Sequence, residues 1–269
     1  MKFTIINNTQ DVLSKKMSSD GIKSSHAILI DGTYETIEVE NLYEFNNILN
    51  KLEFNMAITL GITDATFGLI TTREYLASRK EQNKNINVVS RSKEHFRLEN
   101  ESILFFDIDF NDLTTTKITS YEQILNIIEE IDEQFIDAEI LIRHSSSSNI
   151  YKYHKHEKIK IYGTGSYHVY FVARNANTNL DKYVKQLEDR AFELGYGYFK
   201  VSKTGSLLKR QVFDSSVFSP ERLIFESGMI CDYPYEQEKV EAFYRKGTYI
   251  DCAKLPQVNS FILHSNIGI

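Results

Sequence analysis

The stretch Leu104-Phe105-Phe106-Asp107-Ile108-Asp109-Phe110 places two aspartates at alternate positions of an otherwise apolar run. This run predicts a buried β-strand, and because strand side chains alternate between faces, Asp107 and Asp109 are expected to share one face. Neighbouring carboxylates repel each other and are costly to bury without compensation. A divalent cation removes that cost, and Mg²⁺ or Mn²⁺ with hard oxygen ligands commonly accompanies phosphate substrates. The alternative is a strand end at which both acids reach water.

Strand and helix patterns alternate from this run toward the C-terminus. Apolar spacing predicts helices over about 120–133 and 180–194, and Ser120 with Gln123, or Thr119 with Glu122, offers a capping box for the first. Short apolar runs predict strands at 138–142, 166–173, 197–202, 210–214 and 222–227. We therefore expect an α+β fold around a mixed sheet.

The first hundred residues are mixed in pattern. Apolar runs at 26–30 and 34–39 flank Asp31-Gly32 and predict a β-hairpin. Further expected elements are a helix over 42–52, a strand over 56–62 and an exposed polar stretch over 79–100. No linker divides the chain. The predicted division is an N-terminal α/β lobe at 1–100, a catalytic lobe at 101–255 and a C-terminal tail at 256–269, which would lead to further domains in a longer protein.

Composition narrows the class of protein. The chain has 269 residues, of which 42% are hydrophobic and 25% charged, as in soluble globular proteins. It contains two cysteines, Cys231 and Cys252, too few for a four-cysteine zinc site and typical of a reduced intracellular protein, so we expect a cytoplasmic location. The N-terminus has no apolar signal-peptide stretch, and no run reaches the roughly 18 apolar residues of a membrane span, so no membrane association is expected.

Charge is distributed unevenly along the chain. Residues 143–210 contain 13 Lys and Arg and five Asp and Glu, a formal charge of +8 within a protein of net charge −6. A basic segment in an acidic protein indicates a polyanion site. The alternative is a solvated face with scattered lysines.

A second candidate site lies in the run Gly163-Thr164-Gly165-Ser166-Tyr167-His168-Val169-Tyr170-Phe171. On a strand, Ser166, His168 and Tyr170 share one face, and a hydroxyl and an imidazole at alternate positions can both donate to phosphate oxygens. The preceding glycines allow a ligand to approach the backbone. The chain has no Walker loop, and parallel side chains make a hydrolytic Ser–His couple improbable. A purely structural role for this strand is the alternative.

A third candidate site follows residue 210. Asp214 ends a short apolar run and is a candidate third metal ligand, although aspartate at a strand end is also a common turn former. After Ser219-Pro220, Arg222 shares one strand face with Glu226 and is a candidate triphosphate clamp.

The order of the three motifs resembles that of the archaeo-eukaryotic primase superfamily, specifically the primase-polymerases of plasmids, phages and other mobile elements. The motifs are Phe106-Asp107-Ile108-Asp109, Ser166-Tyr167-His168 and Asp214, within a similarity that covers about residues 57–255. The resemblance implies an RRM-like mixed-sheet catalytic lobe and template-directed, two-metal nucleotidyl transfer.

It also implies a role for each matching position. The catalytic and metal-holding residues would be Asp107, Asp109 and Asp214, with two Mg²⁺ or Mn²⁺ ions. The nucleotide-binding residues would be Gly165, Ser166, His168 and Arg222. The partners would be a single-stranded DNA template, nucleoside triphosphates and a replicative helicase acting in cis or in trans. The roles of Arg91, Arg143 and His144 are open, and Arg91 is a candidate contact to template or nucleotide.

The chain departs from many of these relatives because it lacks the cysteines of their zinc-binding insertion, so no zinc is expected. His144, His154 and His156 lack a fourth ligand, and an exposed polar loop is the better interpretation of that region. Two main alternatives to a primase remain: a two-metal nuclease or phosphoesterase that uses the same acids, and a noncatalytic nucleic-acid-binding module of the same fold. A third, an Asp-x-Asp glycosyltransferase, would leave the Ser-x-His strand without a role.

Overall fold

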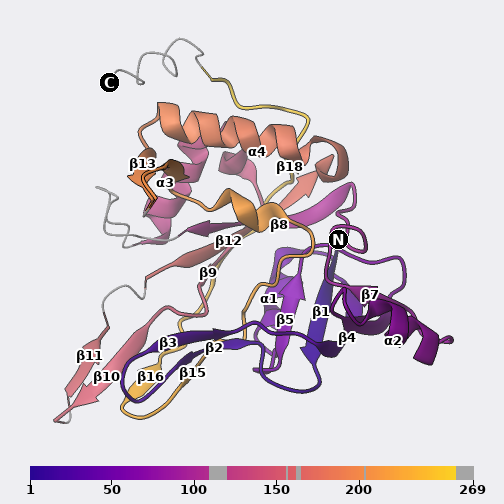
Figure 1. Ribbon diagram of the computed structural model, residues 1–269. Coiled ribbons are helices and arrows are strands. Elements are labelled where there is room, and N and C mark those ends of the chain that lie inside the picture. Colours follow the sequence, from indigo (N-terminus) through magenta and orange to yellow (C-terminus); the bar gives the residue numbers. More distant parts are fainter. Residues whose placement is uncertain (109–119, 156, 162–164, 203, 259–269) are drawn as a thin grey trace.

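The computed structural model describes residues 1–108, 120–155, 157–161, 165–202 and 204–258. These residues form an α+β fold in which helices cover a ten-stranded mixed sheet (Figure 1), as the sequence predicts for the fold class. The described helices are α1 (Leu42–Leu49), α2 (Leu76–Gln82), α3 (Tyr121–Ile131), α4 (Ala176–Glu193) and the short 3₁₀ turns η1 (Glu133–Asp137) and η2 (Ser215–Phe218). None of the described helices is both long enough and apolar enough to cross a membrane.

The large sheet has the order β17-β9-β12-β8-β1-β4-β6-β7, with β18 added beside β12 and β5 beside β1. Its strands are β1 (Lys2–Asn8), β4 (Asp31–Glu38), β5 (Met56–Thr59), β6 (Phe67–Thr71), β7 (Val88–Ser90), β8 (Glu101–Ile108), β9 (Ile140–His144), β12 (Tyr167–Arg174), β17 (Phe243–Arg245) and β18 (Ile250–Asp251). The central strands β9, β12 and β8 pair antiparallel. β8 and β1 run parallel and meet at a single pair, Lys2 opposite Ser102.

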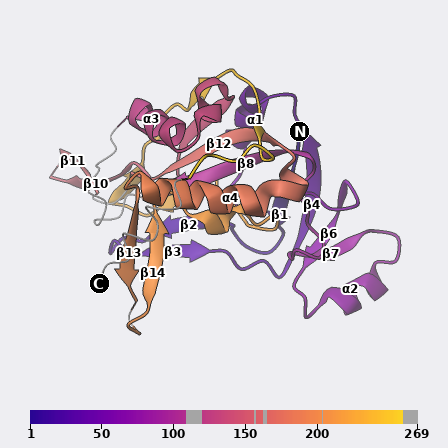
Figure 2. The same ribbon diagram turned by 90° about the horizontal axis from the view of Figure 1, so that it is seen from above.

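Three small sheets extend from this body. They contain β2 (Ser14–Met17) with β3 (Lys23–His26) and β15 (Met229–Cys231), β10 (Ile150–His154) with β11 (Glu157–Lys160) and β16 (Tyr235–Gln237), and the hairpin β13 (Gly197–Val201) with β14 (Leu207–Gln211). In the view from above, the β13–β14 hairpin projects away from α4 (Figure 2).

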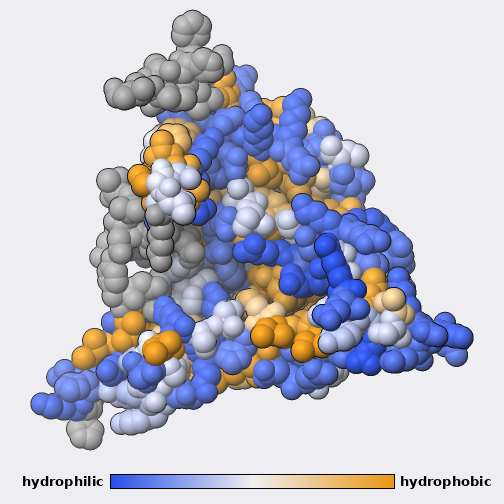
Figure 3. All heavy atoms as spheres, in the orientation of Figure 1, coloured by the Kyte–Doolittle hydropathy of each residue, from blue (hydrophilic) through white to orange (hydrophobic). Residues whose placement is uncertain are grey.

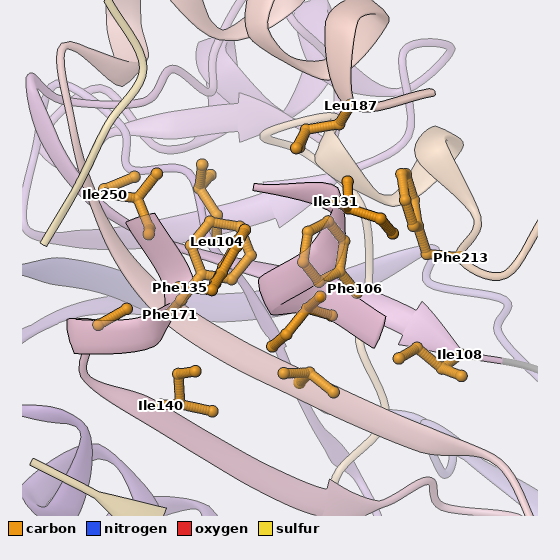
Figure 4. Close-up of a cluster of buried hydrophobic side chains, with 14 of the residues drawn as sticks. Leu104, Phe106, Ile108, Ile131, Phe135, Ile140, Phe171, Leu187, Phe213 and Ile250 are labelled. Atoms are coloured by element: carbon orange, nitrogen blue, oxygen red, sulfur yellow. The ribbon is translucent and has the colours of Figure 1, made fainter. Parts of the chain in front are cut away.

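Both faces of the central strands are buried, each in its own core. On one face α3 and α4 cover a cluster around Phe106, whose ring lies 4.6 Å from that of Phe213 and 5.0 Å from that of Phe171 between ring centres (Figure 4). On the other face α1 packs against alternate residues of the same strands, including Phe105 and Tyr170. Alternation along β8 thus sends Phe106 to one core and Phe105 to the other.

The helix patterns of the sequence are reproduced closely. Ser120 caps α3 by accepting from the backbone N–H of Gln123 at 3.4 Å, one of the two predicted capping pairs. Helix α4 begins four residues earlier than predicted but buries Tyr183, Leu187 and Ala191 as expected. Amphipathic helices are the elements that local spacing specifies best.

The predicted hairpin around Asp31-Gly32 is wrong. β4 pairs with β1 and not with the preceding run, and β3 pairs with β2. Gly32 lies inside β4, where a Cβ atom would collide with the backbone oxygen of Asn7, so this glycine serves strand packing and not a turn. The apolar run before it remains exposed at Ile28.

Two other local expectations also need correction. The stretch 79–100, predicted to be exposed, contains the end of α2 and the buried strand β7. The predicted strand at 222–227 is an extended segment that makes one isolated bridge, between Ile224 and Ile58 of β5. Both are cases in which tertiary pairing overrides local pattern.

Candidate active site

Asp107 lies at the centre of a row of three side-chain positions contributed by three segments. β12 pairs with β8 so that His168 is directly opposite Asp107, and His168 Nε2 lies 3.7 Å from Asp107 Oδ1. On the other edge of β8, Asp214 forms an isolated antiparallel bridge with Asp107, and its backbone N–H donates to the Asp107 carbonyl at 2.9 Å. Residues directly opposite in antiparallel pairs have Cβ atoms about 5 Å apart and share a face. The three predicted site residues therefore converge.

Asp214 also begins η2. Its Oδ1 accepts from the backbone N–H of Ser216 and its Oδ2 from the Ser216 hydroxyl, each at 2.9 Å. Arg222 Nη1 donates to the same hydroxyl at 3.3 Å. The carboxylate of Asp214 and the guanidinium of Arg222 are thus held at one turn, which brings the predicted clamp beside the predicted acid.

The donor chemistry of this row suits a hard divalent cation. Asp107 and Asp214 supply carboxylates from directly opposite backbone positions, and the side chain of Asp107 is 26% exposed, accessible yet partly buried. Asp109, the third predicted acid, lies outside the described residues, and within those residues no group of three His, Cys, Asp or Glu side chains is arranged to hold a metal. Mg²⁺ is commonly bound by one or two carboxylates together with waters and substrate phosphates, which the described pair fits.

Gly165 and Ser166 lie at the start of β12. A Cβ atom on Gly165 would meet nothing within 4 Å, so the backbone there faces open space. The Ser166 carbonyl accepts from the backbone N–H of Ser145 at 2.9 Å and from the Ser148 hydroxyl at 2.6 Å. The serine run after His144 is therefore a packed structural loop that supports the strand carrying His168.

Glu226 also belongs to this region, although the sequence-based prediction gave it no role in the site. Its carboxylate is buried, with a side chain 1% exposed, and it accepts from His168 Nδ1 and, at 2.7 Å, from the Tyr170 hydroxyl. Its other oxygen accepts from Arg143 Nε at 2.7 Å. Buried glutamates are rare unless they are paired, and Glu226 among apolar neighbours was the available sequence signal.

The charges in this network support one another. Burial by itself would raise the pKa of Glu226, but the charges of His168 and Arg143 lower it to about 2. Burial would lower the pKa of His168, but the charge and hydrogen bond of Glu226, with the charge of Asp107, raise it above the ordinary value. With Nδ1 bound to Glu226, the Nε2 side of the ring faces Asp107.

Arg143 fastens the same network to the N-terminal half of the chain. Its Nη1 donates to Asn46 Oδ1 and, at 2.9 Å, to Asn50 Oδ1, at the end of α1. Two of the three guanidinium nitrogens, Nε and Nη1, therefore have partners inside the protein. Arg143 acts here as a structural connector, a role that the sequence alone did not assign.

A hollow of about 340 Å³ opens beside Asp107 and His168. Three cationic side chains line it: Lys15 from β2, Arg91 after β7, and Arg222. Lys15 was not predicted because it lies more than ninety positions before Asp107 and only the tertiary fold brings it there. On the face of the molecule in Figure 3, hydrophilic residues predominate, with hydrophobic patches recessed at the centre.

A second hollow of about 320 Å³ meets the first at Asp107. It is lined by both aspartates and by cationic residues of the β13–β14 hairpin, Lys200, Lys209 and Arg210. Asp107 thus forms part of the wall of two cation-lined hollows.

No protein-family model, curated protein or solved structure matches this chain. Its function is therefore inferred from the geometry of the site.

Proposed function

We propose that this protein is a DNA primase or primase-polymerase of the archaeo-eukaryotic type, with an RRM-like catalytic lobe at its centre. It performs template-directed nucleotidyl transfer in the replication of a plasmid, phage or other mobile element. The observation that carries this proposal is the convergence of Asp107, Asp214 and His168 in one row beside a cationic hollow.

The cationic hollow suits a nucleoside triphosphate. Its volume of about 340 Å³ falls within the ordinary range of small-ligand sites. Lys15, Arg91 and Arg222 bring positive charge from three separate segments to a space whose floor holds His168. Charge-assisted hydrogen bonds from such groups are the usual means of holding phosphates. A phosphodiester-cleaving enzyme has no need for a triphosphate site, so this hollow favours synthesis over cleavage.

The two described aspartates, with Asp109 predicted beside them, are the residues that would hold Mg²⁺ or Mn²⁺. When bound, such ions lower the pKa of a primer hydroxyl and offset charge on a leaving pyrophosphate. The protein's own contribution is positional. The β8–β12 ladder fixes His168 next to Asp107, and the Asp214–Ser216–Arg222 turn fixes a guanidinium at the rim.

Glu226 contributes by orienting His168. Because the carboxylate accepts from Nδ1 and is itself held by Arg143 and Tyr170, the imidazole cannot rotate without breaking a buried hydrogen bond. Its Nε2–H is therefore directed to the Asp107 side, where it can donate to a phosphate oxygen in the hollow. Such fixed donors cost no reorganisation when charge develops.

The test is nucleotide incorporation. The protein is incubated with single-stranded DNA, Mg²⁺ or Mn²⁺ and labelled ribo- or deoxynucleotides, with and without a primer, and the products are resolved by length. New template-dependent strands are expected. Shortened template with no new strand would instead establish a nuclease, and DNA binding without either product would establish a noncatalytic module.

Asp107→Asn or Asp214→Asn is expected to reduce synthesis at least about 100-fold, because a lost metal-holding carboxylate removes several kcal/mol of transition-state stabilisation. Asp11→Asn, which alters an exposed acid near the N-terminus, is the matched control and keeps wild-type activity. Both site variants should melt at the wild-type temperature, because asparagine fills the same space. Synthesis at the wild-type rate by either site variant would refute the assignment of the acids.

A further inference from the structure

Much of the positive charge of residues 143–210 is carried by two hairpins, β10–β11 and β13–β14, which differ in how their cations are engaged. On β10–β11, Lys158 lies 3.5 Å from Glu238 and 3.7 Å from Glu236, and its ammonium lies 4.6 Å from the centre of the Tyr151 ring. Lys160 donates to Asn149 at 3.2 Å. On this hairpin Lys158 is therefore matched by two acids, and Lys160 is engaged by a neutral amide oxygen.

The β13–β14 hairpin has one face attached to α4. Phe199 packs on Phe192 of the helix with ring centres 5.3 Å apart, and Lys209 pairs with Asp189 at 2.9 Å. Phe199 and Lys209 are directly opposite each other in the β13–β14 ladder, so both contacts to α4 come from the same face of the hairpin. The contacts hold the hairpin in a defined position at the end of α4.

Its other face has different chemistry. The register places Tyr198 opposite Arg210 and Lys200 opposite Leu208, and alternation puts these four side chains on the face away from Phe199. In the part of the chain that the structure describes, Lys200 and Arg210 form no ion pair, whereas Lys209 on the first face does. Tyr198, Lys200 and Arg210 all line the hollow that ends at Asp107 and Asp214.

We infer that this face of the hairpin binds single-stranded DNA, with the Tyr198 ring stacked on a base and Lys200 and Arg210 contacting backbone phosphates. This inference rests on the proposed function in one respect: the hairpin face is taken to be the path by which a template strand reaches Asp107 and Asp214. An aromatic ring beside two uncompensated cations is the combination that proteins use for unpaired strands irrespective of sequence, because every base offers a π-face. A duplex offers phosphates but no free base face.

The test measures binding of the full-length protein to a fluorescent oligothymidylate of about 20 nucleotides, without nucleotide or divalent metal, over a series of KCl concentrations. The double variant Lys200→Ala/Arg210→Ala should bind more weakly, and the slope of log K against log salt should fall in magnitude by about 1.4, at about 0.7 per lost phosphate contact. The matched control, Lys152→Ala/Lys158→Ala on the other hairpin, should keep the wild-type affinity and slope.

Tyr198 is tested separately. Tyr198→Ala should weaken binding by about 5-fold or more, as expected for loss of one base–aromatic stack, and Tyr198→Phe should restore nearly all of the affinity because the ring is kept. Binding of blunt duplex should be insensitive to Tyr198→Ala. The variants at Tyr198, Lys200 and Arg210 should melt within a few degrees of wild type, since these side chains are on the face of the hairpin away from Phe199.

Several results would overturn the inference: no binding by the wild-type protein, equal losses in the two double variants, or equal affinities of the Tyr198 variants. The binding assay contains neither metal nor nucleotide, so the two proposals fail separately. DNA synthesis by a protein whose hairpin variants bind normally would refute only the hairpin site. Hairpin-dependent binding by a protein that never extends a strand would refute only the polymerase.

Discussion

His144 is a half-buried imidazole that is uncharged near neutral pH. Its ring lies 4.6 Å from that of Tyr167 and 5.8 Å from that of Tyr121 between ring centres, and its Nδ1 is buried with no hydrogen-bond partner in the described structure. Burial, and secondarily the charge of Lys160, lower the pKa of His144 to about 4. This histidine therefore belongs to an aromatic cluster of the C-terminal half.

The lowered pKa of His144 makes the folded protein less stable as the pH falls. Well above pH 6.5 the imidazole is neutral in both the folded and the unfolded state, and its contribution to the free energy of unfolding is complete. Between pH 6.5 and 4 the unfolded chain binds a proton that the folded protein excludes, so the free energy of unfolding falls as pH falls. Wild type should lose roughly 2–3 kcal/mol more than His144→Phe between pH 7.5 and 4.5, measured by urea unfolding. Parallel pH dependence of the two proteins would contradict this.

At the scale of single residues, alternation within a run was predictable and pairing between runs was not. The pattern around Asp107 and around His168 assigns each side chain to a face, as observed. That the two strands pair in the register placing these residues opposite each other depends on the whole sheet. Lys15 and Glu226 join the site only through the tertiary fold, from distant parts of the chain. An acid among apolar neighbours marks Glu226 as unusual, but no local pattern indicates Lys15 or the partners that either residue meets.

The element that carries Arg222 and Glu226 is held in place by β5. Ile224 exchanges two backbone hydrogen bonds with Ile58, of 2.8 and 3.0 Å, and the N–H of Gly61 donates to the carbonyl of Pro220 at 3.0 Å. A Cβ atom at Gly61 would lie 2.5 Å from that oxygen and 2.6 Å from Pro220 Cβ. The close approach thus requires glycine.

Gly61→Ala should therefore push the Pro220 segment outward. We expect a loss of about 1–3 kcal/mol in the free energy of unfolding, the usual range for overpacking. Because the same segment supplies Arg222 to the rim of the cationic hollow, the KM for nucleotide should rise more than kcat falls. Denaturant unfolding and steady-state incorporation kinetics check the two effects. An unaltered KM in a destabilised variant would show that the segment does not contribute to nucleotide binding.

Elements with strong internal periodicity were predicted well, and those defined by partners were not. Helices α1, α3 and α4 follow the apolar stripes of their own sequence. The hairpin predicted over residues 26–39 does not form, because a strand can pair with any of several others. β4 pairs with β1, which offers a longer ladder than the neighbouring run does. The isolated bridge at Ile224 is a further case of structure set by a partner.

On the scale of the whole molecule, the predicted boundary near residue 100 runs through a continuous structure. β1 adjoins β8 within the large sheet, and one core contains Phe3 and Phe45 from the N-terminal part together with Phe105 and Tyr170. Their rings are in direct contact, with 4.8 Å between Phe3 and Phe45 and 5.1 Å between Phe45 and Tyr170. The α+β class was predictable from pattern, but this shared core was not.

The two parts should therefore unfold as one cooperative unit. The chain has no tryptophan, so single replacements provide clean probes. Phe54→Trp reports on the N-terminal part and Tyr196→Trp on the α4 side, and their fluorescence transitions in urea should coincide in midpoint and slope. Separate transitions would indicate two independently stable domains on either side of residue 100.

Asp107 forms part of the wall of both hollows, so the two proposed ligands would be interdependent. A triphosphate on one side and a nucleic-acid strand on the other would each bring negative charge toward the same carboxylate, so in the absence of a neutralising cation each would oppose entry of the other. A divalent ion bound at Asp107 would reverse this effect, so that each ligand would raise the affinity of the protein for the other. Because binding coupling is reciprocal, it would do so to the same extent whichever ligand arrives first.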